Sequence, residues 1–385
     1  MTYRIALFAL CLYVFTMPWE HSTDMGSQIG SICRVMGILA MIAGIGAVLM
    51  RGSLRRMTAF HVTAGIFYLL VLASFFWTVD DDATATAVRS FAQAMFVVWL
   101  LWEFAPEMAQ RRRLMFSYIA GGYVTSYLTM RDFLSMRITT HNEVRISAEG
   151  WNPNELAVVL SLGVPFAARL VLKPSSLLVR IVALGYLFIA PATVLLTASR
   201  GGAIAMTIAG LSVALILGEG SARRKIVAIA LLVIILAAAA AVAPQNSWDR
   251  LTTIGTELNG GGMNDRLAIL RTGLKVFSAS VPNAAVGVGA DGFMDAVGLG
   301  YVAHNTYLSV LVNNGIVGFA IFMSLLARAA MSAMHSASPE RKAIVFSLLC
   351  WTVAIAAGSW DHNRVSWFLL AISYTAGAPV LPALP

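Results

Sequence analysis

About twelve apolar runs, separated by short polar segments, constrain this chain more than any other feature. A helix rises about 1.5 Å per residue, so about 20 apolar residues cross the hydrocarbon core of a membrane. The runs cover residues 4–18, 29–50, 58–78, 84–102, 114–130, 155–172, 177–197, 201–218, 226–243, 305–328, 342–358 and 365–380. We therefore predict an all-α polytopic membrane protein with about 12 transmembrane helices, in which the runs flanking Ser199–Gly202 could also form one broken helix.

The composition excludes an ordinary soluble domain. The chain is 58% hydrophobic and 12% charged, whereas soluble domains carry about 25% charged residues. Its net charge of +8 would suggest nucleic acid in a soluble protein, but the cations lie in clusters between apolar runs, so we exclude nucleic-acid binding. Cys11, Cys33 and Cys350 lack metal-ligand spacing and are read as packing residues.

The basic clusters predict the orientation of the chain, because cytoplasmic connections are enriched in Lys and Arg. These clusters fall in alternate connections: Arg51/Arg55/Arg56, Arg111–Arg113, Lys173/Arg180, Arg223–Lys225 and Arg341/Lys342. Both termini are then cytoplasmic, and the first run is an uncleaved span. One outer connection, residues 244–304, is far longer than the others. It separates a first group of spans (1–243) from a last group (305–385), and we expect the two groups to act as one membrane domain.

The long connection contains a predicted amphipathic helix, residues 266–277, lying against the outer face of the bundle. Its apolar face would carry Leu267, Leu270, Leu274 and Phe277, and its other face a positive potential. The run Gly287–Gly292 is only a weak signal of a phosphate-binding loop, because no strand precedes it.

A titratable histidine lies at the start of the next apolar run, residues 305–328. This histidine, His304, is followed by Asn305, and the polar residues Ser309, Asn313 and Asn314 lie deeper in the run. Polar groups at membrane depth are costly unless they have partners, so these residues predict a packed interior or a site. The glycines at 315 and 318 would allow a bend or a close backbone approach.

Three motifs resemble those of the bacterial O-antigen ligase and polymerase family, whose members move lipid-linked glycans on the outer face of the inner membrane. His304-Asn305, followed after nine residues by Gly315-Ile316-Val317-Gly318, is similar to the family signature. Arg266 with Leu270, and Ser199 to Gly202, are similar to its two arginine motifs. The resemblance covers nearly the whole chain and implies a GT-C-like fold in the bacterial inner membrane, with the active site on the periplasmic face.

The resemblance also implies a reaction. A glycan on undecaprenyl diphosphate carries its own leaving group, so the transferase needs charge stabilisation for the diphosphate and a base for the acceptor hydroxyl. Arg200 and Arg266 would bind the diphosphate, because guanidinium groups bind phosphate bidentately. His304 would be the catalytic base, although it could also bind the diphosphate or cap its helix. Such a transfer would invert the anomeric centre and need neither metal nor cofactor.

Other polar and aromatic residues are predicted to support this site, although each also has a structural interpretation. Trp151 could stack on a sugar or anchor the chain at the interface, and the Trp360–Arg364 turn could pair with itself. The supporting residues are Asn305, Arg271, Asp361, His362, Arg364, Asn154, Glu155 and Trp151.

The acceptor separates the alternative functions. A lipid A-core acceptor would make the chain an O-antigen ligase, and a second lipid-linked repeat would make it a polymerase of O-antigen or exopolysaccharide. A flippase or transporter without covalent chemistry is a third hypothesis, disfavoured because no internal inverted repeat is visible.

Overall fold

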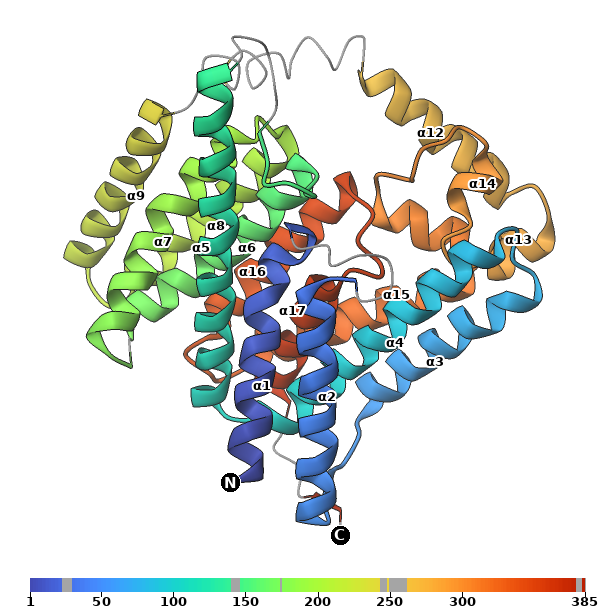
Figure 1. The fold of residues 1–385 in the computed structure, drawn as a ribbon, viewed down its shortest axis with the longest axis horizontal. Coiled ribbons are helices and arrows are strands. Elements are labelled where there is room, and N and C mark those ends of the chain that lie inside the picture. Colours follow the sequence, from blue (N-terminus) through green and yellow to red (C-terminus); the bar gives the residue numbers. More distant parts are fainter. Residues whose placement is uncertain are drawn as a thin grey trace.

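The computed structural model describes residues 1–22, 30–139, 146–173, 175–242, 248, 262–378 and 383–384, and these are mostly helical (Figure 1). The helices are α1 (Thr2–Thr16), α2 (Ile32–Arg51), α3 (Ala59–Ala73), α4 (Asp81–Phe104), α5 (Met108–Thr139), α6 (Pro153–Leu172), α7 (Leu177–Leu196), α8 (Arg200–Leu217), α9 (Ala222–Val242), α12 (Gly262–Phe277), α13 (Val281–Val286), α14 (Phe293–Val297), α15 (Thr306–His335), α16 (Arg341–Ala354) and α17 (Arg364–Gly377). Short 3-10 turns are η1 (Met17–Ser22), η2 (Ser74–Phe76) and η3 (Ile355–Ala357). Two-residue strands, β1 (Leu54–Arg55) and β2 (Ala383–Leu384), pair antiparallel.

Each predicted apolar run coincides with one helix, and the chain is an all-α multi-pass membrane protein. Eight helical segments of the described chain are long and apolar enough to cross a membrane: Thr2–Ser22, Ile32–Arg51, Ala59–Phe76, Asp81–Phe104, Pro153–Leu172, Leu177–Leu196, Arg200–Leu217 and Thr306–His335. Helices α16 and α17 have 14 residues each, fewer than the roughly 20 that a straight span needs. The count of about twelve spans stays a prediction. Residues 244–247 and 249–261 of the predicted long connection lie outside the described residues.

Helix α6 lies at the centre of one half of the bundle. Of its most apolar stretch, 83% is buried inside the protein. Figure 1 shows α5 to α9 together on one side, α3, α4 and α12 to α15 on the other, and α16 and α17 between them. Gly202 of α8 faces Ala157 of α6 so closely that a side chain at position 202 would overlap it. This glycine of the Ser199–Gly202 motif therefore permits close helix packing.

Two helices, rather than one broken helix, flank the Ser199–Gly202 motif. Helix α7 ends at Leu196 and α8 begins at Arg200. Between them Ala198 has a φ of 47°, in the left-handed region that a continuous helix does not use. The Ser199 hydroxyl then accepts a hydrogen bond from the Gly202 N–H at 3.0 Å and caps the new helix.

Buried ion pairs hold one end of the bundle together. The Glu340 side chain is fully buried and accepts from Arg112 at 2.7 Å, with Arg169 at 3.5 Å. These contacts join α5, α6 and the start of α16. Glu103 is likewise buried and pairs with Arg51. Buried charges are stable only when they are paired, so these carboxylates fix the basic segments that the sequence assigns to the cytoplasm.

Helix α15 is interrupted at Gly315, which has φ 63° and ψ −171°. A side chain at this position would overlap the backbone of Ala285 and Val286. The N–H groups of Val288 and Gly289 donate to the carbonyls of Val312 and Asn313 at 3.0 and 3.1 Å. The glycine run from 287 is therefore a docking segment for the broken helix, and its weak resemblance to a phosphate-binding loop stays untested. As predicted, Ser309, Asn313 and Asn314 are buried.

Helix α12 forms as predicted, but most of its expected packing face is turned outward. Leu267, Leu270 and Leu274 are 38%, 38% and 43% exposed. The helix packs through Ile269 and Gly273 instead. A Cβ at Gly273 would lie 3.0 Å from Phe293 and 3.3 Å from Leu308. The missing side chain therefore lets this face of α12 pack closely against Phe293 and Leu308.

Candidate active site

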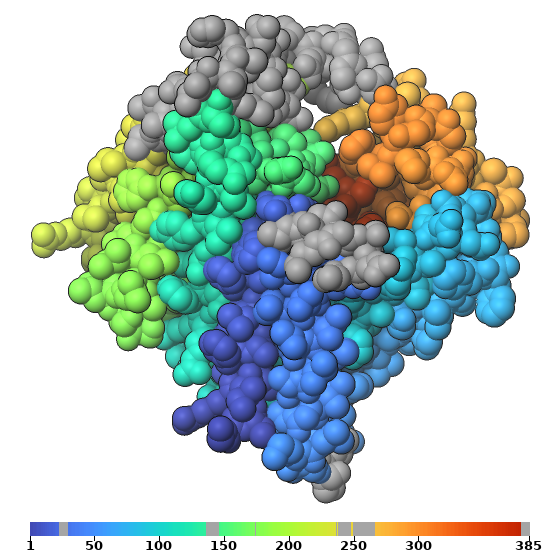
Figure 2. Space-filling model, in the orientation of Figure 1, coloured from blue at the N-terminus to red at the C-terminus, as the bar shows by residue number. Residues whose placement is uncertain are grey.

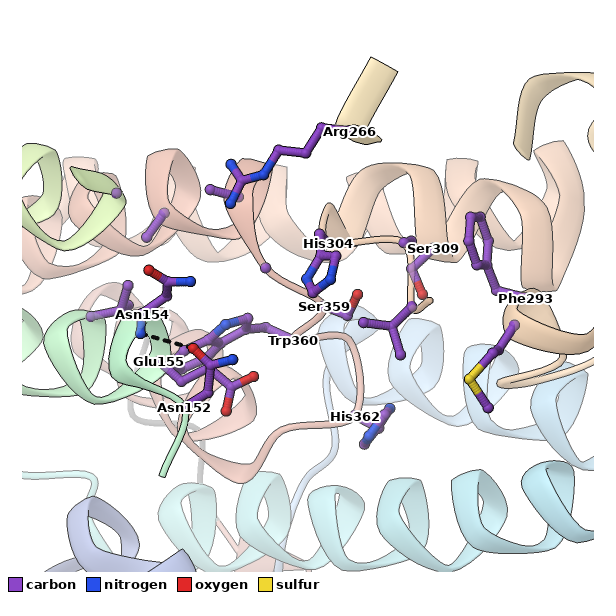
Figure 3. A pocket seen from close by; sticks show the side chains of 18 of the residues that line it. Asn152, Asn154, Glu155, Arg266, Phe293, His304, Ser309, Ser359, Trp360 and His362 are labelled. Atoms are coloured by element: carbon purple, nitrogen blue, oxygen red, sulfur yellow. Dashed lines mark hydrogen bonds between the residues drawn. The ribbon is translucent and has the colours of Figure 1, made fainter. Parts of the chain in front are cut away.

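A cavity of about 680 Å³ lies where the two sides of the bundle meet. Figure 2 shows a hollow between the orange segment and the blue and green segments, with red atoms from the C-terminal part of the chain at its base. In Figure 3 Arg266 and His304 approach from one side and His362 from the other. The lining residues are Asp80, Ala83, Asn152, Asn154, Glu155, Val158, Ala198, Arg200, Gly201, Gly202, Arg266, Asp291, Phe293, Met294, Val302, Ala303, His304, Ser309, Ala354, Ala357, Gly358, Ser359, Trp360 and His362.

The start of α8 presents Arg200 to this cavity. The Ser199 cap also donates a hydrogen bond to Asn154 Oδ1 at 2.7 Å. Asn154 belongs to the first turn of α6, where Asn152 Oδ1 accepts from the Asn154 N–H at 2.9 Å. Two helix N-termini are therefore fixed to each other beside the guanidinium group. Because helix N-termini carry partial positive charge, this corner of the cavity favours an anion.

His304 lies between α14 and α15, with Arg266 of α12 nearby. Asn305 caps α15, since its Oδ1 accepts from the Leu308 N–H at 3.1 Å. Burial lowers the pKa of His304 below its usual value, and the positive charge of Arg266 lowers it further. The imidazole is therefore neutral near pH 7 and can accept a proton.

Backbone strain is concentrated at the cavity. Among the described residues, three other than glycine have positive φ: Ala198 (47°), Asp291 (61°) and His304 (47°). All three line the cavity. Such conformations cost roughly 1–3 kcal/mol and persist where surrounding structure enforces them, which is common at functional sites.

Carboxylates surround His362 in another part of the cavity. The buried Asp361 has one carboxylate oxygen 3.4 Å from the Ser309 hydroxyl and the other 3.9 Å from His362 Nδ1. Burial opposes protonation of His362, but the negative charges of Asp361, Asp291 and Glu155 raise its pKa to about 9. Burial also raises the pKa of Asp291 to about 6. The two histidines of the cavity are therefore held in opposite charge states.

The structure separates the predicted site residues into two groups. Those that line the cavity are His304, Arg200, Arg266, Asn154, Glu155 and His362. Asp361 lies directly behind His362. The remaining predicted residues do not line the cavity. Asn305 caps α15, and Arg271 is exposed on α12. Arg364 pairs with Glu20 and with Gln93 at 3.1 Å, and the Trp151 ring lies 4.5 Å from that of His21.

The sequence interpretation missed one charged residue of the cavity wall that also has a perturbed pKa. Asp291 gave no signal in the sequence, because an aspartate in a glycine-rich run usually indicates only a turn. Its positive φ and its position in the cavity depend on contacts with distant parts of the chain.

Comparison with known proteins agrees with the motifs. No curated protein and no solved structure matches this chain. A protein-family model described as O-Antigen ligase matches residues 185–323. This match includes Arg200, Arg266, His304 and the interruption at Gly315. The match therefore supports the resemblance to the O-antigen ligase and polymerase family that the three motifs predicted.

Proposed function

We propose that this protein is an O-antigen ligase-type glycosyltransferase, which moves a glycan from undecaprenyl diphosphate to a hydroxyl of a lipid A-core acceptor. The match to the O-Antigen ligase family model supports ligase or polymerase activity in general. The observation that carries the proposal is that Arg200, Arg266 and His304 line one cavity although they come from three separate segments. Two fixed cations suit a diphosphate, and a neutral imidazole suits a hydroxyl that must lose its proton.

In the proposed reaction the acceptor oxygen attacks the anomeric carbon of the donor glycan. The new carbon–oxygen bond forms as the bond from that carbon to the diphosphate oxygen breaks. The bonding electrons leave with the diphosphate, whose added charge Arg200 and Arg266 stabilise. His304 takes the proton of the acceptor hydroxyl. Because acceptor and leaving group lie on opposite faces of the sugar, the product has the inverted configuration.

We place this reaction on the periplasmic face of the bacterial inner membrane, with both chain termini in the cytoplasm. The positions of the basic clusters support that orientation. The two guanidinium groups supply charge that a divalent ion would otherwise provide, so we propose a metal-independent transfer. The closest alternative is polymerisation, in which a second lipid-linked repeat is the acceptor.

Transfer by purified full-length protein tests the proposal directly. Protein in lipid nanodiscs would receive an undecaprenyl-diphosphate-linked glycan and either a lipid A-core acceptor or a second lipid-linked repeat, with products separated by mass. We expect transfer to the core. Transfer only to the repeat would establish a polymerase instead. No covalent product with either acceptor, but movement of the lipid-linked glycan across vesicles, would indicate a transporter and refute the proposal.

Matched variants connect the reaction to the cavity. His304→Ala should reduce kcat by about 100-fold, within the usual range for a general base. His335→Ala is its control, because this exposed histidine lies in the last turn of α15. Arg266→Ala should weaken donor use, whereas Lys275→Ala removes another exposed cation of α12 that does not line the cavity. Equal effects within either pair would contradict the assigned roles.

A further inference from the structure

The turn that carries Asp291 contains a charged residue where glycine is usually preferred. The Gly292 N–H donates to the Gly289 carbonyl at 3.1 Å and closes the turn. Asp291 is the third residue of this turn and has a φ of 61°. Turns with positive φ at the third residue favour glycine there. Here glycines occupy both ends, and the strained position carries a carboxylate.

This turn is held on both sides by hydrogen bonds to distant segments. The Ala290 N–H donates to the Ser74 hydroxyl at 3.1 Å, and the Thr84 hydroxyl donates to the Ala290 carbonyl at 2.8 Å. On the other side, the Gly289 N–H donates to the Asn313 carbonyl at 3.1 Å. The backbone beside Asp291 is therefore fixed between α15 on one side and η2 and the first turn of α4 on the other. A carboxylate on such a support has a defined position in the cavity.

The Asp291 carboxylate differs from two neighbouring carboxylates in its hydrogen bonding. Asp80 Oδ1 accepts from the Ala83 N–H at 3.0 Å, and Asp361 lies against Ser309 and His362. Within the described part of the chain, no group donates a hydrogen bond to the side chain of Asp291, which lines the cavity. A ligand in the cavity can therefore reach this acceptor.

The charged groups of the cavity form two sets. Arg266 acts electrostatically on His304, whereas Asp291 interacts with His362, Asp361 and Asp80. A diphosphate would be attracted to the first set and repelled by the second, where three carboxylates, Asp291, Asp361 and Asp80, outnumber the single imidazolium of His362. The second set is suited to sugar hydroxyls, because an ionised carboxylate can accept several hydrogen bonds.

We propose that Asp291 determines acceptor specificity: its carboxylate accepts hydrogen bonds from an uncharged acceptor sugar and rejects one that carries a phosphate beside the reacting hydroxyl. This inference rests on the proposed transferase function and adds the chemical class of the acceptor sugar. Asp291 is a specificity-determining residue in this role, and His304 remains the base. The raised pKa of Asp291, about 6, still leaves the carboxylate ionised at pH 7.5.

Two acceptors test the proposal: a neutral core oligosaccharide and the same oligosaccharide with a phosphate on the neighbouring hydroxyl. With wild-type protein in nanodiscs at pH 7.5, kcat/KM should be at least about tenfold higher for the neutral acceptor than for the phosphorylated one. A repelled charge in a binding site produces discrimination of this size. Asp291→Asn should reduce this preference to about threefold or less and leave the donor KM unchanged. Asparagine tolerates positive φ, so this variant keeps the turn. Asp295→Asn, an exposed residue of α14, should keep the wild-type preference.

An unchanged preference in Asp291→Asn, or an equal rise in donor KM, would overturn the proposal. Binding of the neutral oligosaccharide, followed by saturation-transfer NMR, separates this outcome from failure of the transferase function. If wild-type protein transfers nothing but binds the oligosaccharide more tightly than Asp291→Asn does, the transferase proposal fails and the sugar-binding role of Asp291 stands. If both proteins bind the oligosaccharide equally, or neither binds it, the role of Asp291 is refuted.

Discussion

Gly315→Ala should destabilise this protein more than a substitution of its kind usually does. With φ 63° and ψ −171°, Gly315 adopts a conformation that is almost restricted to glycine. Forcing alanine into it costs about 1–3 kcal/mol. The new methyl group would also overlap the backbone of Ala285 and Val286, which cannot rotate away as a side chain could. We therefore expect the free energy of unfolding to fall by about 3 kcal/mol or more, because the cost of overpacking adds to the cost of the backbone strain.

The control for this prediction is a glycine with positive φ in open space. Gly298 also has positive φ, 68°, but nothing lies within 4 Å of the position that its Cβ would occupy. Gly298→Ala should therefore cost only about 1–2 kcal/mol, from the left-handed backbone. Thermal unfolding of both variants in the same detergent, followed by size-exclusion fluorescence, gives the comparison. If Gly315→Ala unfolds at the same temperature as Gly298→Ala, the close backbone approach at the interruption of α15 does not matter for stability.

Two further predictions concern the cavity. Transfer should be constant above about pH 7 and fall on acidification below about pH 6.5, because the pKa of His304 is lowered and only its neutral form accepts a proton. Arg266→Gln should move this acidic limb to higher pH, since it removes a cation that disfavours protonation; an unmoved limb in a pH–kcat profile would exclude His304 as the titrating group. Arg200→Lys should raise the donor KM by about tenfold and Arg200→Ala by more, because lysine keeps the charge but loses the bidentate geometry. Equal KM values for the two variants in donor titrations would show that only charge matters.

Local patterns predicted most of the helices. Apolar runs near the length of a membrane crossing located each of them, because lipid leaves the backbone few alternatives to a helix. The bend at Gly315 was also anticipated, since positive φ depends on residue type. The residues at 200, 266 and 304 were identified through family resemblance, and the structure places all three in one cavity.

Features that depend on distant contacts could not be predicted in this way. Three leucines of α12 face outward because Gly273, which is not hydrophobic, provides the closest approach to Phe293. The glycines at 287 and 289 resemble a phosphate-binding loop in the sequence. In the structure they allow a close approach to the Asn313 backbone and to Thr78. Asp291 entered the site only through the tertiary contacts of its turn. In each case the deciding partner lies far away in the sequence.

The order in which the cavity is built has a consequence for biogenesis. Its lining begins at Asp80 and is completed only by residues 354–362. During synthesis, Arg200 and Arg266 are therefore made well before the segment that contains His362. A partly inserted chain has cations that can attract a lipid-linked donor, but it lacks the wall that would shield the sugar from water. The complete cavity therefore forms only when the last helices are in place.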